Sequence, residues 1–434
     1  MKKLLVITYY WPPSGGSGVQ RWLKLCKYLP EFGWEPIVYT PENPDASLTD
    51  PSLAADIQPD QTVIKHPIVE PRRIYGKVIG RGKGGADSDE ILYLDPSQRS
   101  WKQNTLVWAR SNLLIPDARS LWIRPSVRFL SGYLRDNPVD AIISTGPPHS
   151  MHLIARNVKR KLGLPWIADF RDPWTGIVYF DRLPLSKWAL RKHRSLEGSV
   201  LREADAVVDV TPSWAENDRR RGAKRVVTIY NGFDPADRLE HPPAASRRFT
   251  ISHLGVLTAD RNHEAFWDAL SAIADGRPDF KKDLEVRLIG RVDQSVAQSS
   301  ERTGLGENVV DVGYLPHGDA VREMHAAAVL LLPINRRQHT DPGIIPGKLY
   351  EYLASGRPIL LIGPTDGDAA EIVRQSGAGV VCDYDDVAGI RTAISGWYDR
   401  HTSGMLRAES SDVEKFSRRN QAREYAGLLD DLLR

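Results

Sequence analysis

Short apolar runs alternate with amphipathic stretches along most of this chain. The apolar runs have the length of strands, and the stretches between them carry apolar residues three and four positions apart, which is typical of helices. Between residues 19 and 30, for example, Trp22, Leu23, Cys26 and Leu29 share one helical face. The pattern predicts strands at residues 3–8, 36–40, 141–144, 165–170, 206–210, 226–229, 249–254, 284–289, 309–312, 329–333, 359–362 and 379–382.

The alternation of strands and helices predicts the fold class. Strands that are separated by helices form parallel sheets covered by helices on both faces, and this series is too long for one sheet. We therefore expect an α/β protein with two doubly wound, Rossmann-like domains. The turn at Asn231-Gly232 and the polar stretch that follows it mark the boundary. The predicted organisation is an N-terminal domain at residues 1–235, a second domain at 236–412 and a terminal helix at 413–434.

Composition is consistent with this organisation and excludes several classes. A chain of 434 residues exceeds the size at which one core keeps growing. Cys26 and Cys382 lie far apart and outside any C-x-x-C pair, so we expect neither a disulfide framework nor a zinc cluster. The apolar start, residues 1–8, is too short for a signal peptide, and no apolar run approaches the ~18 residues of a membrane span. We expect a cytoplasmic protein, at most peripheral on the inner face of a membrane.

The net charge of +3 conceals an asymmetry between the two halves. Residues 1–235 hold 34 Lys and Arg against 25 Asp and Glu, and the rest of the chain holds 24 against 30. A basic first half suits anionic lipid head groups or an acidic acceptor, whereas ordinary surface variation explains it equally well. Nucleic acid is not an expected partner, because the basic residues are scattered and no binding motif accompanies them.

The most informative stretch is residues 346–360. It reads as a short helix that starts near Lys348, ends at Gly356 and leads into an apolar strand. Lys348 and Glu351 are three residues apart and therefore share a face. The free N–H groups and partial positive charge of a helix start, together with a Lys, suit a diphosphate, and a carboxylate one turn further can accept hydrogen bonds from a ribose. Taken alone, this pair also fits an ordinary solvated helix face.

The residues that flank this pair favour a binding site, because the rigid, apolar stretch 342–346 would hold the helix start in a cleft. The block also resembles the nucleotide-sugar segment of retaining family-4 glycosyltransferases with the GT-B fold, in the subgroup reading P-x-K-x-x-E-Y-x-A-x-G-x-P. The resemblance implies that Glu351 holds ribose hydroxyls. It also implies two domains that face a central cleft, with the terminal helix crossing back to the first domain.

A glycine-rich loop joins the first strand to the first helix. Gly15, Gly16 and Gly18 let backbone N–H groups approach a phosphate or a sugar, although a plain flexible connection is an alternative. The spacing does not fit the G-x-G-x-x-G fingerprint of dinucleotide binding. The family resemblance implies a loop that closes over the transferred sugar.

Three polar residues at strand ends in the first half are candidates for acceptor chemistry. Asp169 and Asp172 end the strand at 165–170, at the edge where such folds bind ligands. An Asp–Arg ion pair that only ties loops together is the alternative. His149 opens a helix, where the helix dipole favours a neutral imidazole, though a lone His at a helix start is more often a capping or packing residue. We expect Asp172 to orient or deprotonate the acceptor, with His149 and Asp169 as the further catalytic candidates.

In the second half, Arg261 follows a strand and a loop. This element resembles the G-x(n)-R-N segment whose Arg binds the donor diphosphate in the family, so Arg261 and Lys348 are the expected pair of cations. Two cations on a diphosphate can replace a metal as stabiliser of the leaving nucleotide. Gly290 and Tyr314, each just after a strand, are expected at the base pocket.

One departure from the family pattern concerns the transferred sugar. The wider family places a second Glu eight residues before Glu351, but position 343 is Gly. Asp341 or the backbone of Gly343, Ile344 and Ile345 would then contact the sugar. Asp87-Ser88-Asp89 matches a metal-binding D-x-D, but it lies in a Gly-rich polar insertion at 78–105, and a solvated turn explains it better. We expect no catalytic metal and no cofactor.

Together these residues predict a retaining, metal-independent glycosyltransferase that moves a sugar from a nucleotide-sugar donor to a saccharide or lipid-linked acceptor, in surface polysaccharide or glycolipid assembly. A GT-B-fold nucleotide-sugar epimerase acting without an acceptor is the main alternative, with a Rossmann oxidoreductase or a non-catalytic scaffold less favoured. Trp101, Trp108 and Trp122 lie among basic residues, as at a membrane interface, although Trp residues packed in a core are the equal alternative.

Overall fold

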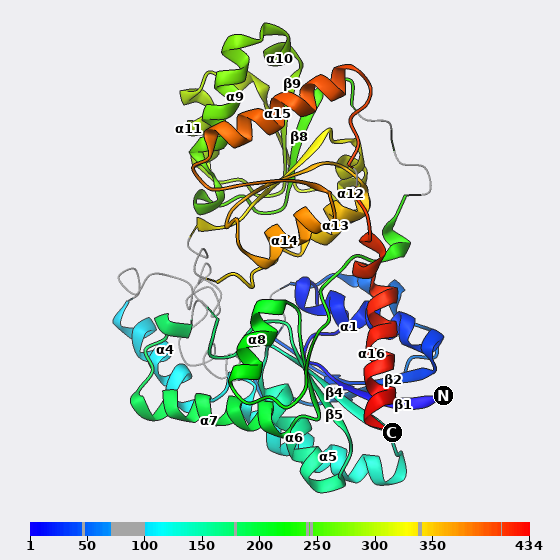
Figure 1. Ribbon diagram of the computed structural model, residues 1–434. Helices are drawn as coiled ribbons and strands as arrows, with labels where there is room; N and C mark the ends of the chain where they lie inside the picture. Colours follow the sequence, from blue (N-terminus) through cyan, green and yellow to red (C-terminus); the bar gives the residue numbers. More distant parts are fainter. Residues whose placement is uncertain are drawn as a thin grey trace. The chain divides into compact units, whose positions relative to one another are not determined.

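The computed structural model describes residues 1–45, 48–70, 100–177, 180–239, 243, 246–336, 341–408 and 410–434. The described chain forms two compact α/β units (Figure 1). The first contains Met1–Tyr230 together with Arg418–Arg434, and the second contains Asn231–Ser417. The sequence analysis placed these divisions after residues 235 and 412. Most of the insertion at 78–105, including Asp87 and Asp89, lies outside the described residues.

The first unit is built on a parallel sheet in the order β3-β2-β1-β4-β5-β6-β7. Its strands are β1 (Lys2–Ile7), β2 (Trp34–Pro41), β3 (Val63–His66), β4 (Ala141–Gly146), β5 (Trp166–Phe170), β6 (Ala206–Asp209) and β7 (Val226–Thr228). Its α-helices are α1 (Ser17–Tyr28), α4 (Trp101–Leu113), α5 (Ile123–Asp136), α6 (Ser150–Leu162), α7 (Lys187–Glu203), α8 (Pro212–Arg220) and α16 (Arg418–Leu432).

The second unit is built on a parallel sheet in the order β10-β9-β8-β11-β12-β13. Its strands are β8 (Phe249–Leu254), β9 (Leu284–Ile289), β10 (Val309–Gly313), β11 (Val329–Pro333), β12 (Ile359–Ile362) and β13 (Gly379–Cys382). Its α-helices are α9 (Glu264–Gly276), α10 (Pro278–Asp283), α11 (Gln294–Arg302), α12 (His317–Ala326), α13 (Lys348–Ser355), α14 (Asp368–Gln375) and α15 (Val387–Thr402).

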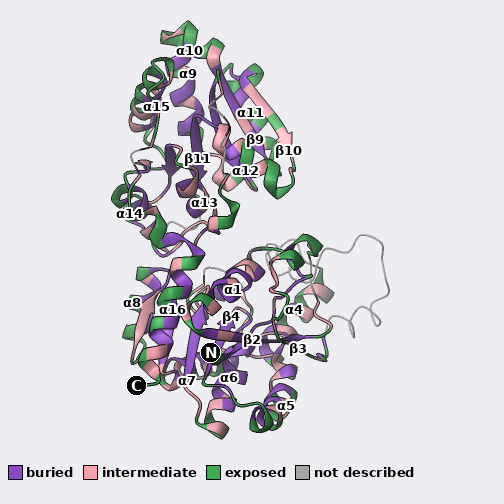
Figure 2. Ribbon diagram, turned by 90° about the vertical axis from the view of Figure 1, so that its right-hand side faces the viewer, coloured by how far each residue is buried: buried purple, intermediate pink, exposed green. Residues whose placement is uncertain are grey.

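Both sheets are covered on both faces, and most residues of their central strands are buried (Figure 2). In β1, Leu5 and Ile7 join one apolar cluster while Leu4 and Val6 join the cluster on the opposite face. Such strands read as continuous apolar runs, which is why the sequence pattern identified them. The predicted fold class, two Rossmann-like domains of the GT-B type, is confirmed.

Strand order reverses once in each unit, and this reversal locates the functional edge. In the first unit β1 lies between β2 and β4, and in the second unit β8 lies between β9 and β11. At such a reversal, the loops that follow the two neighbouring strands run in opposite directions. They leave room for a ligand at the carboxyl ends of the strands. The loops after β1 and β4, and those after β8 and β11, are therefore the places to look for binding residues.

The end of the chain differs from the single helix expected at 413–434. A short 3₁₀ turn at Val413–Phe416 is followed by Ser417 in extended backbone, and α16 begins only at Arg418. The extended residue separates the turn from the helix. Helix α16 then packs on α1, where the rings of Trp22 and Tyr425 lie 5.2 Å apart. Among the described residues, the structure holds no helix with both the length and the apolar character of a bilayer span.

Candidate functional site

Three glycines shape the carboxyl edge of the sheet in the second unit. Gly255 and Gly290 follow the neighbouring strands β8 and β9, Gly313 is the last residue of β10, and all three have positive φ. The Gly255 N–H donates to Ile289 O at 2.8 Å, and the Gly290 N–H donates to Gly313 O at 2.7 Å. A Cβ at position 290 would lie 2.2 Å from Gly255 O. Gly290, expected at the base pocket, therefore has a packing role that does not need a ligand.

Lys348 and Glu351 form an ion pair on the exposed side of α13. Lys348 is the first residue of the helix, and its Nζ lies 2.7 Å from Glu351 Oε2. The two side chains are 36% and 34% exposed, so they lie at a surface and are neither buried nor fully surrounded by water. The predicted helix start and shared face are both present. The two opposite charges remain within reach of a ligand.

The opposite face of α13 anchors the helix to the edge of the sheet. Leu349, Tyr350, Tyr352 and Leu353 are buried. The Leu254 N–H at the end of β8 donates to Tyr352 Oη at 2.9 Å. Because this bond joins α13 to the strand before the Gly255 loop, the helix start is held beside the reversal of strand order.

His253 connects this helix to Arg261. The His253 ring is buried in β8, its Nδ1 lies 3.1 Å from Leu331 O, and its Nε2 has no hydrogen-bond partner within the described structure. Burial lowers the pKa of His253, the hydrogen bond to Leu331 O opposes this, and the positive charges of Arg261 and Lys348 add to the lowering, so that the pKa is about 4. Both cations therefore act on the same imidazole, which places Arg261 and Lys348 in one electrostatic neighbourhood.

Arg261 ends a 3₁₀ turn, Ala259–Arg261, after β8. Its Nη1 lies 3.3 Å from Val256 O, within the same loop. The next residue, Asn262, is fixed by bonds from Trp267 Nε1 at 2.8 Å and to Ser299 Oγ at 2.9 Å. This contact with α9 and α11 gives the loop that carries Arg261 a rigid base.

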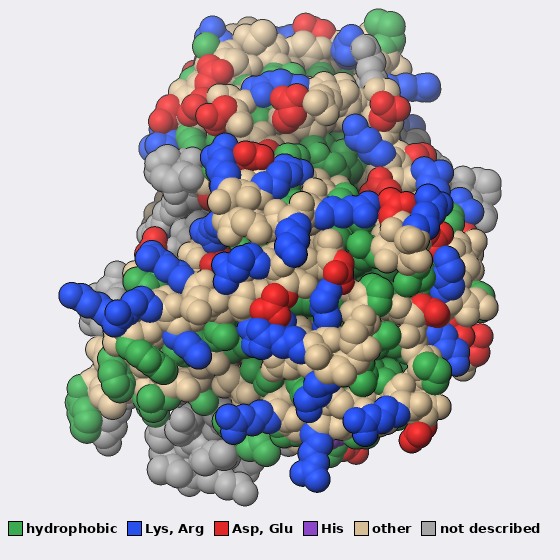
Figure 3. All heavy atoms as spheres, turned by 60° about the horizontal axis from the view of Figure 1, so that its bottom comes forward, with side chains coloured by type: hydrophobic (Ala, Val, Ile, Leu, Met, Phe, Trp, Pro, Cys, Tyr) green, Lys and Arg blue, Asp and Glu red, His purple; other side chains and the backbone are tan. Residues whose placement is uncertain are grey.

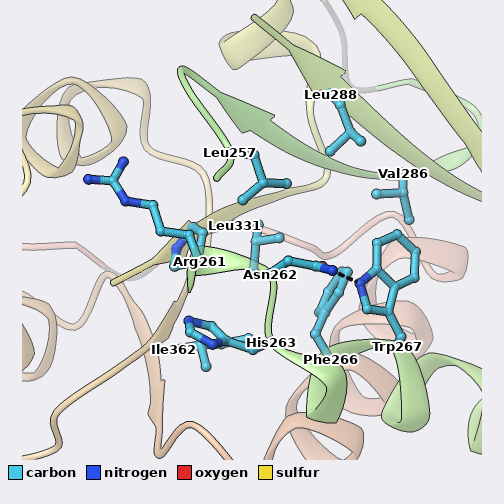
Figure 4. A pocket seen from close by; sticks show the side chains of 11 residues that line it. Leu257, Arg261, Asn262, His263, Phe266, Trp267, Val286, Leu288, Leu331 and Ile362 are labelled. Carbon is cyan, nitrogen blue, oxygen red and sulfur yellow. Dashed lines mark hydrogen bonds between the residues drawn. The ribbon is translucent and has the colours of Figure 1, made fainter. Parts of the chain in front are cut away.

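Figure 4 shows a small cavity below this loop, lined mainly by apolar side chains, while the guanidinium of Arg261 extends away from it. The cavity holds about 10 Å³, which is room for no more than one water molecule. It is a packing void of the core, and a nucleotide would have to bind on the outer side of the loop.

The segment before α13 folds back on itself. The Gly343 N–H donates to Asp341 Oδ1 at 3.0 Å, and the Ile344 N–H lies 3.4 Å from Asp341 O. Gly343 is buried, and Ile344 and Ile345 are half-buried. The Asp341 carboxylate is thus engaged in holding the loop. Which of the two predicted groups, Asp341 or the backbone of Gly343–Ile345, replaces the absent Glu at 343 stays open.

His317 lies near the pair on α13, and Tyr314 follows β10. The His317 Nε2, at the start of α12, lies 3.5 Å from Asp237 Oδ2, and a hydrogen bond to Asp237 raises the pKa of His317, with the Glu351 carboxylate adding to the rise. Tyr314 is 88% exposed, so its ring is free of core packing and available to a flat ligand. Neither His253 nor His317 was a candidate from the sequence. The sequence feature that could have identified His253 as a candidate is its position as a single imidazole inside an apolar strand.

In the first unit, Asp169, one of the predicted catalytic residues, is enclosed in the core. Asp169 has no exposed surface and lies among four donors from three elements: Arg21, Trp22, Thr145 and Tyr425. Burial alone would raise the pKa of its carboxyl, but Arg21 and these hydrogen bonds outweigh burial and the pKa is lowered. A fully enclosed, fully bonded carboxylate cannot reach a substrate. It joins β5 to α1, β4 and α16.

Arg171 fixes the glycine-rich loop. Its guanidinium donates to Gly18 O at 3.2 Å and to Pro147 O, and it lies 5.7 Å from the centroid of the Tyr10 ring. A Cβ at Gly18 would lie 2.9 Å from the Tyr10 ring, and Gly16 has a φ of 89°. These glycines are required by the backbone and by packing, and the loop after β1 is tied to the loop after β4. Gly15 is held by a 2.8 Å bond from its N–H to Leu48 O.

Asp172 and His149 follow β5 and β4 at this edge, where Asp172 is half-buried and His149 is buried. Asp172 is half-buried just beyond β5, where its charge acts on Arg171. The His149 ring stacks on Trp174 at 4.8 Å with an angle of 3° between the ring planes. Burial lowers the pKa of His149 well below its ordinary value, and His152 and Arg171 lower it further, so the ring is neutral near pH 7, as expected. Of the two, Asp172 is the more accessible, and an acceptor role for either residue stays a prediction.

Among the described residues, no group of three or more His, Cys, Asp and Glu side chains is arranged to hold a metal ion. The candidate metal motif at Asp87–Asp89 is outside that part of the chain. Metal independence stays a prediction.

Comparison with known proteins matches both halves of the chain. Residues 15–232, half of the chain, match the family model of the glycosyl transferase 4-like domain, and residues 248–400 match that of glycosyl transferases group 1. No curated protein matches the sequence as a relative.

Solved structures of similar fold cover nearly the whole chain. HepE from Anabaena, solved with UDP, has a TM-score of 0.61 at 15% identity and covers 99% of this chain and 100% of its own. Sucrose-phosphate synthase from Thermosynechococcus elongatus has a TM-score of 0.61 at 14% identity, covering 100% and 99%. A Listeria monocytogenes protein described as a UDP-N-acetylglucosamine 2-epimerase has a TM-score of 0.55 at 11% identity, covering 99% and 96%.

These structural likenesses support the fold, and the two domain matches give the family. The chain belongs to the family-4-like glycosyltransferases of the GT-B fold.

Proposed function

We propose that this glycosyltransferase takes a sugar from a nucleoside-diphosphate donor and transfers it to an acceptor hydroxyl with retention of configuration. The observation that carries the proposal is the grouping of Arg261, Lys348 and Glu351 at the carboxyl edge of the second sheet. Two cations suit a diphosphate, and one carboxylate suits the two hydroxyls of a ribose.

Donor binding would replace the ion pair of α13 with contacts to the ligand. Without a ligand, Lys348 and Glu351 neutralise each other at 2.7 Å. An ion pair at a surface contributes little to stability, about 0–1 kcal/mol, so exchanging it for a phosphate and a ribose costs little. Lys348 would turn to the diphosphate together with Arg261, and Glu351 would accept hydrogen bonds from the ribose.

The start of α13 adds to this binding. The helix dipole and free N–H groups at its first turn favour an anion beside Lys348. The bond between Leu254 N and Tyr352 Oη keeps that turn in place, so little conformational freedom is lost on binding. Tyr314, with its exposed ring, would stack on the nucleobase.

Transfer with retention would follow a front-face course. In such a reaction the acceptor oxygen attacks on the side from which the phosphate leaves, and a phosphate oxygen takes up the acceptor proton. The enzyme then has to orient the acceptor and stabilise the leaving diphosphate, and it needs no strong base. Asp172 and the neutral His149 would orient the acceptor, and the backbone of Gly343–Ile345 would contact the donor sugar.

The choice of first donor to test comes from the solved neighbours. HepE has been solved with UDP, with UDP and glucose, and with UDP-glucose. We therefore propose a uridine donor as the first probe and a saccharide or lipid-linked acceptor of the kind used in surface polysaccharide or glycolipid assembly. Arg261 and Lys348 would supply the charge compensation that a metal ion supplies elsewhere, so EDTA should leave transfer unchanged.

The test is a transfer assay with a panel of nucleotide sugars and simple sugar acceptors, run beside thermal shift with each nucleotide. Lys348→Ala and Glu351→Ala should each abolish transfer and leave the fold intact. Arg322→Ala is the matched control, because Arg322 forms a surface ion pair with Asp319 on α12 at the same spacing of three residues. Normal turnover in either α13 variant would contradict the proposal.

An epimerase is the second candidate, favoured only by the Listeria fold neighbour. It would convert the donor without any acceptor. A nucleotide-sugar assay that lacks acceptor separates the two functions.

A further inference from the structure

The two faces of the sheet in the second unit differ in character. In β8, Phe249 and Ile251 belong to the apolar cluster on one face. Thr250 and Ser252 alternate with them along the strand and therefore point to the opposite face. A central parallel strand is normally apolar on both faces, as β1 is in the first unit. The hydroxyl side chains on this second face of β8 are a departure from that rule.

Two charged residues of β9 lie beside these hydroxyls. The register of the two strands pairs Thr250 with Glu285 and Ser252 with Arg287. Thr250, Ser252 and Glu285 are 2%, 0% and 9% exposed. Buried polar side chains need hydrogen bonds to offset the water that they lose. We therefore expect each of these side chains to have a partner, either in the protein or in a ligand.

A hollow of about 180 Å³, the α12 hollow, lies over these four side chains. Helix α12 packs on this face of the sheet, and its C-terminal end contributes Glu323, Ala326 and the following Ala327 to the hollow. Two consecutive alanines leave the space between the helix and the sheet unfilled. The side chains of Arg287 and Glu323 are 25% and 27% exposed, so the hollow opens to water on their side.

Ser252 lines the buried end of the α12 hollow, and the protein does not use its hydroxyl. Its Oγ is buried and has no hydrogen-bond partner within the described structure. Thr250 Oγ1, by contrast, accepts a bond from the Ala328 N–H at 3.0 Å. A buried hydroxyl without a partner destabilises a fold, and an alanine at the same place would avoid that cost. A group that enters the hollow and bonds to Ser252 accounts for the hydroxyl.

The charges around the α12 hollow cancel one another. Arg287 donates from Nε and Nη2 to the Glu323 carboxylate at 2.9 and 3.0 Å, and from Nη1 to Glu285 Oε1 at 2.7 Å. The other oxygen of Glu285 accepts from Arg248 Nη1 at 2.8 Å. Two cations thus balance two anions, unlike the face of the molecule in Figure 3, where Lys and Arg side chains outnumber Asp and Glu. A charged ligand would find no uncompensated opposite charge here, which favours a neutral one.

We propose that the α12 hollow binds a neutral polyhydroxy molecule of the size of one sugar ring, such as a hexose or a cyclitol. An apolar cavity of about 150 Å³ admits a benzene ring, so a hollow of about 180 Å³ has room for one six-membered ring. Its polar walls select a ring that carries hydroxyls. Because sugar hydroxyls both donate and accept, they can bond to the Ser252 hydroxyl and to the carboxylate oxygens of Glu285 and Glu323.

The α12 hollow is separate from the proposed donor site. Strand β8 runs from Thr250, at the hollow, towards Gly255, at the carboxyl edge of the sheet, and five residues of strand span ~16 Å. The residues proposed to hold the nucleotide lie at that edge. The hollow is therefore a second site, and a sugar bound there would not occupy the place of the donor.

The experiment is calorimetric titration of the full chain with neutral probes (glucose, galactose, mannose and myo-inositol) and charged ones (glucuronate and glucosamine). Ser252→Ala removes the unpartnered hydroxyl, and Ala326→Leu fills the hollow. Ser300→Ala and Ala320→Leu are the matched controls, because Ser300 is buried on α11, Ala320 is half-buried on α12 and neither lines the hollow. Each titration is repeated with Lys348→Ala, which changes the proposed donor site alone. Circular dichroism checks that each variant folds.

At least one neutral probe should bind the wild-type protein more tightly than either charged probe does. Ser252→Ala should weaken this binding by ~2–10-fold, as expected for the loss of one neutral hydrogen bond. Its melting temperature without a probe should not fall, because the hydroxyl has no partner to lose. Ala326→Leu should abolish binding, and both control variants should bind as the wild type does.

Three results would overturn the proposal. The first is the absence of binding by every neutral probe, which would mean that the α12 hollow holds water only. The second is undiminished binding by both hollow variants. The third is loss of probe binding in Lys348→Ala, which would place the sugar at the donor site. Because probe binding and nucleotide binding are measured separately, failure of the proposed function would leave this test intact.

Discussion

The carboxyl edges of the two sheets carry similar residues and use them in opposite ways. In the first unit the Asp169–Arg21 pair is enclosed, with side chains 0% and 1% exposed. In the second unit the Lys348–Glu351 pair is about one-third exposed on each side. Asp169 has its bonding capacity filled by the protein, whereas Lys348 and Glu351 bond to each other at a partly exposed surface. One pair holds the fold together, and the other is available to a ligand.

This contrast shows that a polar residue at a strand end is informative only when its accessibility is known. Asp169 lies where catalytic carboxylates of such folds are found, yet α1 and α16 cover it and supply donors. On α13, Leu349 and Tyr352 turn inward and leave the two charged side chains outside. Function is therefore to be sought where the packing leaves charges incompletely surrounded.

The largest expected effect is on the enclosed pair. Asp169→Ala would leave the Arg21 guanidinium buried without its carboxylate, and breaking a buried pair in this way costs ~3–5 kcal/mol. Hydrogen exchange of the strands of the first unit should report this loss of stability. If Asp169→Ala does not fold, Asp169→Asn, which keeps the shape and part of the bonding, should fold with lower stability. Wild-type stability in both variants would contradict the structural role of Asp169.

The second-largest expected effect is a pH dependence of the free energy of unfolding, which the titration of His253 causes. Its folded pKa of about 4 lies below the ordinary value of 6.5, so between these pH values the unfolded chain binds a proton that the folded chain does not. The contribution of neutral His253 to the free energy of unfolding is complete above pH 6.5. It is lost as the pH falls to 4, which lowers the free energy of unfolding by up to ~3 kcal/mol. Denaturant unfolding of the second unit, followed from pH 7.5 to 4, checks this. His253→Gln should show a smaller slope, and an unchanged slope would contradict the assignment.

A somewhat smaller effect is expected at Gly290. An alanine there would place Cβ 2.2 Å from Gly255 O at a φ of 126°, so the backbone of the edge must shift, at a cost of ~2 kcal/mol or more. Gly396→Ala is the control: it lies within α15, nothing lies within 4 Å of the added Cβ, and the helix should gain up to ~1 kcal/mol. Melting temperatures of the two variants should therefore move in opposite directions.

The smallest expected change is in the stability of the α13 pair itself. Lys348→Ala should alter the free energy of unfolding by less than ~1 kcal/mol, because the pair is partly exposed and screened by water. Combined with lost transfer, this would separate a binding role from a structural one. A loss of stability as large as that of Asp169→Ala would remove the contrast between the two edges.

The sequence predicted the fold and the position of the α13 pair because both depend on local patterns. Continuous apolar runs specify buried parallel strands, and a spacing of three residues places Lys348 and Glu351 on one face whatever surrounds them. The break at Ser417 was not predicted, since an extended residue between two helical segments leaves no strong signal in composition.

The remaining differences come from contacts between residues that are distant in the chain. Tyr425 on α16, which is 256 positions away, helps to enclose Asp169. No residue near Asp169 in the sequence indicates that α16 packs there. Trp122 and Trp108 look alike in the sequence, but Tyr39 stacks on Trp122 and no described residue covers Trp108 to the same degree. His253 acquires its role because a loop and a helix bring Arg261 and Lys348 to it.

The most direct test of the central claim is calorimetric titration of UDP into the wild-type protein and into the double variant Arg261→Ala with Lys348→Ala. If these two cations hold the diphosphate, the double variant should bind UDP at least ~100-fold more weakly, since each charged hydrogen-bonding group contributes about 1.5–3 kcal/mol. Binding of uridine, which lacks the phosphates, should change little. Equal affinity of the two proteins for UDP would show that the nucleotide binds elsewhere.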